Sequence, residues 1–143
     1  MERNSLSLKS SGTAKSAADI LRMSQALNNS VEQYHPLILC FILSFDEIVH
    51  NMKIFFKLSS LVKNEEAREL SYKDLFLYCK ENGVIKGTLS EWMFYQCLRK
   101  KIKPGMDMQT VREIIKAAPK FVGEINYMVD GLERELRKYR TLN

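Results

Sequence analysis

A chain of 143 residues has room for one domain, and its content of 45% hydrophobic residues is enough to form a buried core. The net charge of +5 permits an acidic or phosphate-bearing partner without requiring one. Three cysteines without a CxxC pair, and only two histidines, argue against a disulfide framework and a metal centre, and we expect no cofactor.

The N-terminal residues predict a cytoplasmic protein. Residues 1–11 are polar and rich in serine, and they lack the apolar segment of a signal peptide. The longest apolar run, from Leu37 to Leu43, is far shorter than the roughly 20 residues that span a bilayer. Cys40, Cys79 and Cys97 each fall within an apolar helical pattern, so we expect them to be reduced core residues.

Residues 1–12 show no helical period, and we expect a flexible tail there, followed by one helical-bundle domain over residues 13–140. Apolar residues recur at spacings of three and four between Ala14 and Leu27, which predicts a first helix. A second helix follows with Pro36 in its first turn, and its apolar stripe continues to Leu61.

The run from Leu37 to Leu43 makes the first half of the second helix apolar on every side. Such a helix is buried on more than one face, and in a small domain the additional face most easily meets another subunit. We therefore predict a homodimer whose interface includes Leu37, Phe41 and Phe45. A short buried strand is the alternative, but the helical period continues unbroken past Phe45.

Two capping motifs mark the next helices. Ser71 and Asp74 resemble a capping box at the start of a short third helix, and Gly83 is placed to end it. Thr88 and Glu91 form a better capping box at the start of a fourth helix.

The sequence Pro104-Gly105 ends the fourth helix, and Asp107 can cap a long last helix whose apolar stripe runs from Val111 to Leu136. Pro119 falls inside that helix and predicts a kink or a break. About five helices with short connections predict an all-α fold, an antiparallel up-and-down bundle.

No enzyme motif of a familiar kind is present. The chain lacks a Gly-rich phosphate loop, a GxSxG elbow and an HExxH pair. Asp46 and Glu47 are adjacent on a helix, so their side chains point about 100° apart and do not suit joint acid–base catalysis. Asp46 lies near an apolar face, where a carboxylate requires a partner unless solvent reaches it.

Four cations within five positions form the sharpest local feature: Arg99, Lys100, Lys101 and Lys103. Such a cluster is tolerated in solvent and favoured around an anion, because Arg can grip phosphate with two hydrogen bonds and Lys adds a point charge. The helix dipole also favours cations at a C-terminus, so a purely structural role is the alternative.

Two aromatic residues share a helical face with Arg99. Trp92 and Tyr95 precede Arg99 by seven and four residues. Aromatic rings beside cations can stack on a base or anchor an interface, and the alternative is a place in the core.

Several features occur in a distinctive order: an aromatic-rich helix from Phe41 to Asp46, a segment from Ser71 to Ile85, Trp92 followed by Arg99, and Asp107 before the last helix. They are similar to the RFEFTFE helix, the SPREVIREAFEAGLI segment, the W…MLxDRN helix and the final-helix acid of one family. The chain thus resembles the nucleotidyltransferase substrate-binding proteins, a branch of the HEPN superfamily.

The resemblance covers Pro36 to Leu136 and implies a dimeric helical bundle. It also implies a partner, a minimal nucleotidyltransferase that is usually encoded next door and whose substrate this subunit would help to bind. Related HEPN proteins are ribonucleases, often toxins of toxin–antitoxin pairs, with an Arg-x4-His motif completed across the dimer interface.

The chain departs from that ribonuclease motif. The residue five positions after Arg99 is Pro104, which has no group that can move a proton. Lys100 stands where the family has Asn, and Met106 stands where it has Tyr. Lys103 is adjacent, but an ordinary lysine titrates far too high to act as a base at neutral pH.

The sequence therefore predicts a non-catalytic subunit that binds nucleotide or substrate for a partner nucleotidyltransferase, in a two-component system like a toxin–antitoxin pair. The predicted contacts are Arg99, Lys100, Lys101 and Lys103 around one groove. Two alternatives remain open: a divergent HEPN ribonuclease with another base, and a plain RNA- or DNA-binding module.

Overall fold

The protein is built from helices, and the computed structural model describes residues 18–20, 34–66 and 68–140. Four helices have both ends placed: α2 (His35–Val62), α3 (Tyr72–Glu81), α4 (Leu89–Lys101) and α5 (Met108–Arg140). Residues 18–20 are also helical, and no strand occurs among the described residues. The all-α prediction is confirmed, whereas the predicted tail and most of the predicted first helix lie outside the described residues.

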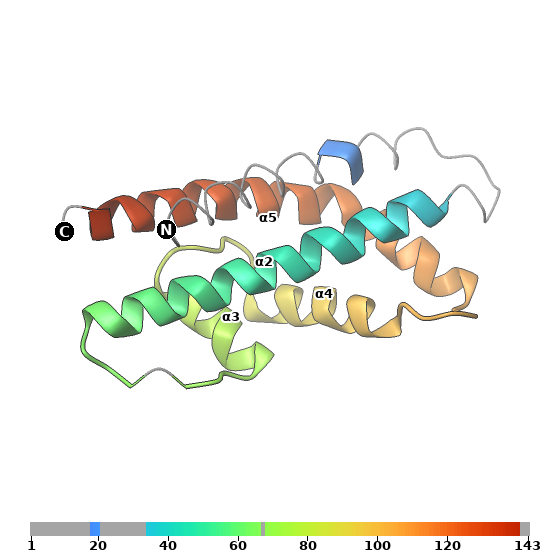
Figure 1. Ribbon diagram of the computed structural model, residues 1–143. Coiled ribbons are helices and arrows are strands. Elements are labelled where there is room, and N and C mark those ends of the chain that lie inside the picture. The colour runs from blue at the N-terminus through green and yellow to red at the C-terminus, as the bar shows by residue number, and fades with distance from the viewer. Residues whose placement is uncertain (1–17, 21–33, 67, 141–143) are drawn as a thin grey trace.

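The long helices alternate in direction along the chain. Figure 1 shows α4 running opposite to both α2 and α5, with the short α3 below the C-terminal end of α2. Helix α2 packs against α3, α4 and α5, and α4 also contacts α3 and α5. None of the helices in the described part of the chain is long and apolar enough to cross a membrane.

Helix α2 begins where Pro36 predicts it and, together with α5, contributes most of the core. The side chains of Leu37, Phe41 and Phe45 are buried within the single chain, each at most 1% exposed. These three residues therefore belong to the core and do not form a subunit interface as predicted. The exposed apolar residues of the same run are Leu39 and Leu43, at 49% and 54%.

The predicted caps of α3 and α4 are present. The Asp74 amide donates to Ser71 Oγ at 3.2 Å, and Gly83 follows the helix with a φ of +72°, a conformation that favours glycine. The Glu91 amide donates to Thr88 Oγ1 at 3.1 Å, and the Thr88 amide donates to Glu91 Oε1 at 3.0 Å. Both reciprocal bonds of a capping box are thus formed.

Helix α5 continues through Pro119 without a break. The Thr110 amide donates to Asp107 Oδ1 at 2.9 Å, which confirms the predicted cap and holds the pKa of Asp107 below its usual value. Figure 1 shows α5 bending between its N-terminal and C-terminal parts. A proline lacks the N–H that would bond one turn back, and this loss favours a bend at the cost of one hydrogen bond.

The three cysteines do not all lie in the core, and none of them forms a disulfide bond with a described residue. Cys79 is buried, and burial raises the pKa of its thiol to about 12, which keeps it protonated and unreactive. Cys40 is partly buried and Cys97 is exposed. The prediction of a core position is therefore correct for Cys79 and wrong for Cys97.

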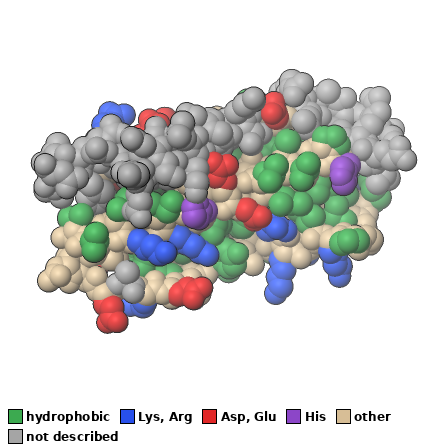
Figure 2. Space-filling model, in the orientation of Figure 1, with side chains coloured by type: hydrophobic (Ala, Val, Ile, Leu, Met, Phe, Trp, Pro, Cys, Tyr) green, Lys and Arg blue, Asp and Glu red, His purple; other side chains and the backbone are tan. Residues whose placement is uncertain are grey.

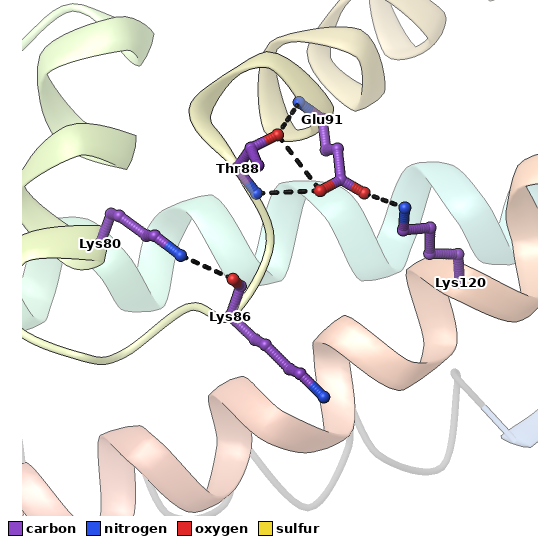
Figure 3. A network of polar contacts seen from close by, with 5 residues as sticks. All are labelled: Lys80, Lys86, Thr88, Glu91 and Lys120. Carbon is purple, nitrogen blue, oxygen red and sulfur yellow. Dashed lines mark hydrogen bonds and ion pairs between the residues drawn. The ribbon is translucent and has the colours of Figure 1, made fainter.

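Glu91 also joins α4 to α5. Figure 3 shows its carboxylate between Thr88 and Lys120, with one oxygen accepting from the Thr88 amide and the other paired with the Lys120 ammonium. The hydrogen bond from Lys120, followed by the one from the Thr88 amide, lowers the pKa of Glu91 to about 2. Beside this network, the Lys80 ammonium donates to the Lys86 carbonyl at 2.7 Å.

This depressed pKa predicts an acid-sensitive contribution to stability. Above the ordinary Glu value of 4.5 the ionised Glu91 stabilises the fold, and this contribution is lost as the pH falls toward about 2. Glu91→Gln keeps the capping geometry and removes only the charge. We expect the difference in unfolding free energy between wild type and Glu91→Gln to shrink between about pH 7 and about pH 3, measured by urea denaturation.

The matched control is Glu81→Gln, which removes a carboxylate that is exposed and has no ion pair with any described residue. Its difference from wild type should stay constant over the same pH range. A constant difference for Glu91→Gln as well would contradict the prediction.

Candidate functional site

The predicted basic cluster lies at the C-terminal end of α4, and its first member is already engaged. Arg99 donates from Nε to Asp46 Oδ1 at 2.9 Å and from Nη2 to Asp46 Oδ2 at 3.0 Å. The hydrogen bond that Arg99 donates to Asp46 is the largest cause that raises the pKa of Arg99. The bidentate pair joins α4 to α2.

The Arg99–Asp46 pair remains open to solvent. The side chain of Arg99 is 32% exposed and that of Asp46 is 53% exposed. An exposed pair of this kind contributes on the order of 0.2–1 kcal/mol, since water competes for both charges. A phosphate could therefore replace the carboxylate of Asp46 on the Arg99 guanidinium at a small cost.

A hollow of about 470 Å³ surrounds this pair, lined by Asp46, Tyr72, Gln96, Arg99 and Lys100. Arg99 and Lys100 are two of the four predicted cations. Tyr72 adds an aromatic ring, and Gln96 adds a side-chain amide that can donate or accept hydrogen bonds. These groups could hold a phosphate and the polar edge of a ligand.

The other two predicted cations lie elsewhere, so the four do not surround one groove as predicted. Lys101 lies 3.7 Å from Glu113 of α5, and Lys103 lines a separate, mostly apolar hollow of about 600 Å³. Consecutive residues of a helix point about 100° apart, and the helix ends before Lys103, so neighbours in sequence are spread around the axis. Among the described carboxylates, none is paired with Lys100 or Lys103.

Trp92 and Tyr95 are core residues and are not available to stack on a ligand. Their side chains are 0% and 2% exposed, and their rings lie 5.4 Å apart, nearly perpendicular. Phe121 of α5 lies 5.1 Å from Tyr95, and Phe76 of α3 lies 5.5 Å from Trp92. Burial, followed by the charges of nearby carboxylates, raises the pKa of Tyr95 to about 12.

Pro104 lies in the exposed loop after α4, in the same hollow as Lys103 and His35. His35 thus comes near the position where the ribonuclease motif would have its histidine. Arg99 does not line this hollow and is held by Asp46 in the other one. Arg99 and His35 therefore do not line the same hollow.

A further hollow, which the sequence did not single out, lies toward the C-terminal end of α2. It has a volume of about 390 Å³, and Lys53, Lys57 and Arg68 are its cations. The signal in the sequence is the spacing of four between the two lysines, which places both on one face of the helix. Among the described residues, no three His, Cys, Asp or Glu side chains are grouped in a way that could hold a metal ion.

No protein-family model, curated protein or solved structure matches this chain. The family resemblance consequently depends on the order and spacing of the motifs described above. What the described residues offer chemically is a helical scaffold with an Arg–carboxylate pair and two basic hollows, a set of groups suited to binding an anion.

Proposed function

We propose that the protein is a non-catalytic subunit that binds nucleotide or substrate for a partner minimal nucleotidyltransferase, in the cytoplasm, within a two-component system like a toxin–antitoxin pair. The observation that carries the proposal is the hollow around Arg99 and Asp46. The Arg99 guanidinium is paired there with an exposed carboxylate, which a phosphate could replace at a small cost. The order of the family motifs in the sequence supports the same reading.

The lack of a histidine among the described residues of the hollow around Arg99 also favours binding over the ribonuclease chemistry of the related HEPN proteins. Pro104 stands where a related ribonuclease has its histidine, and the described side chains that line the hollow with Arg99 include no histidine. The arrangement can hold an anion, but the partner enzyme would supply the chemistry.

Co-expression with the nucleotidyltransferase encoded next to this chain tests the proposal. We expect the two proteins to purify as a complex that binds nucleotide, and Arg99→Ala to weaken nucleotide binding about tenfold, as expected for loss of a charge-assisted contact. Arg112→Ala is the matched control, because it removes an exposed arginine of α5 that lines none of the hollows described here. Failure to form a complex, together with no nucleotide binding, would reject the proposal.

We also propose that the subunit is a homodimer, with a contact that differs from the predicted one. Leu39 and Leu43 are one turn apart on α2 and are both about half exposed. Figure 2 shows hydrophobic side chains gathered on this part of the surface. Leu39 also lines the apolar hollow together with Ile42 and Met106, so the two leucines extend a larger apolar area.

A further inference from the structure

The hollow near the C-terminal end of α2 has the size and lining of a small-molecule site. Its volume of about 390 Å³ lies within the usual range for ligand pockets. Its lining combines cations with apolar side chains, and it is distinct from the hollow around Arg99. The lining residues are Lys53, Phe56, Lys57, Arg68, Glu69, Leu70 and Leu75.

The cations of this hollow lack an obvious structural role. Lys53 and Lys57 are both exposed and one turn apart on α2, an arrangement in which like charges repel. Arg68 adds a third positive charge from the connection between α2 and α3. None of the three is paired with a carboxylate of the described residues. Figure 2 shows a patch of Lys and Arg side chains over this half of α2.

The floor of the hollow is apolar and includes an aromatic ring. Phe56 is partly buried and meets the Tyr78 ring edge-on, with 5.0 Å between the ring centres, so its orientation is held from one side. Leu70 and Leu75 complete the apolar surface. The Lys63 ammonium lies 5.6 Å from the centre of the Tyr78 ring and adds a further positive charge beside the hollow.

We propose that this hollow binds a nucleotide. The phosphates would be held by Lys53, Lys57 and the planar fork of Arg68, and the base would lie against Phe56. Glu69, the one carboxylate of the lining, would accept hydrogen bonds from the sugar hydroxyls. The mixture of cations, one acceptor and an apolar floor favours a nucleotide over inorganic phosphate, which would leave the floor and Glu69 without a partner.

The proposed nucleotide site is separate from the hollow around Arg99, and its residues all come from this chain. Lys53 follows Asp46 by seven residues, which places it about 10 Å further along the axis of α2. The two hollows can therefore be tested separately, and the chain alone should bind nucleotide at the hollow of Lys53 and Lys57.

Titration calorimetry of the isolated chain with ADP tests the site, with inorganic pyrophosphate as the second probe. We expect saturable ADP binding, weaker pyrophosphate binding, and about tenfold weaker ADP binding for each of Lys53→Gln and Lys57→Gln. Glutamine has nearly the helix propensity of lysine, so both variants should keep the fold, which circular dichroism verifies. Lys73→Gln, an exposed lysine of α3 outside this lining, and Arg112→Ala, an exposed arginine of α5 outside it, should bind ADP like wild type.

Three results would overturn the site. They are no saturation of the wild type by millimolar ADP, an equal loss in Lys73→Gln, and binding confined to a single-stranded RNA oligomer with a steep dependence on salt. The last would indicate a general nucleic-acid surface. A fourth result would overturn it as well: loss of ADP binding in Arg99→Ala, with no effect of Lys53→Gln, would assign nucleotide binding to the hollow around Arg99. If only the complex with the nucleotidyltransferase failed to form, the proposal for this hollow would stand, because ADP binding is measured on the isolated chain.

Discussion

Trp92→Ala is expected to lower the free energy of unfolding by about 3–5 kcal/mol, the range measured for truncating a large buried aromatic side chain. The Trp92 side chain is fully buried and lies between Phe76 of α3 and Phe121 of α5, with ring centres 5.5 and 6.4 Å away. Its removal would open a cavity at the point where three helices meet. Urea denaturation followed by circular dichroism measures the loss.

Phe94→Ala is the matched control, because Phe94 lies two residues further along α4 and is 44% exposed. We expect it to cost less than about 1 kcal/mol. Trp92→Phe should retain most of the stability, since the Trp92 Nε1 atom has no hydrogen-bond partner to lose among the described groups. Equal costs for Trp92→Ala and Phe94→Ala would contradict a core role and return Trp92 to the candidates for ligand stacking.

Leu39→Glu combined with Leu43→Glu is expected to convert the proposed homodimer into a monomer. Burying one leucine contributes roughly 1.5–3 kcal/mol, and in a two-fold dimer each substitution occurs twice. Two glutamates in the contact would also have to lose water without a partner. The dissociation constant of the dimer should therefore rise more than about a hundredfold, as measured by sedimentation or light scattering across a dilution series.

Leu61→Glu provides the control for this experiment. Leu61 is 78% exposed near the C-terminal end of the same helix, far from Leu39 and Leu43 along the axis. It should leave the mass in solution unchanged. A wild-type protein that is monomeric at micromolar concentration would contradict the homodimer, and an unchanged mass of the double variant would place the contact on another surface.

Local features of the sequence predicted most of the described fold correctly. The starts of α3 and α4 lie at Ser71 and Thr88, as the capping boxes indicate, and Asp107 caps α5. These signals work because a cap acts through hydrogen bonds between residues three apart, so its effect is contained in a few neighbouring positions. Pro119 shows the limit of such rules, because packing of α5 against α2 and α4 keeps the helix continuous where a local rule allows a break.

The candidate site was predicted only in part. The sequence identified both Arg99 and Asp46 as unusual, but their pairing across 53 positions depends on how α2 and α4 pack. The four cations were predicted to form one group because they lie within five positions of the sequence, whereas the helix and the following loop direct them to different surfaces. Lys53 and Lys57 share one face of α2 through their spacing, but Arg68 joins them only because the connection after α2 brings it to the same hollow.

The sequence by itself determined the helical class, the helix starts and the lack of a histidine five residues after Arg99, since these follow from local hydrogen bonding, periodicity and residue identity. The tertiary structure alone decided which apolar residues are covered and which charges meet. Leu37, Phe41 and Phe45 are core residues because α2 is covered by three other helices, whereas Leu39 and Leu43 stay exposed on its remaining face. Burial and ion pairing depend on contacts between segments distant in sequence, and no local pattern contains them.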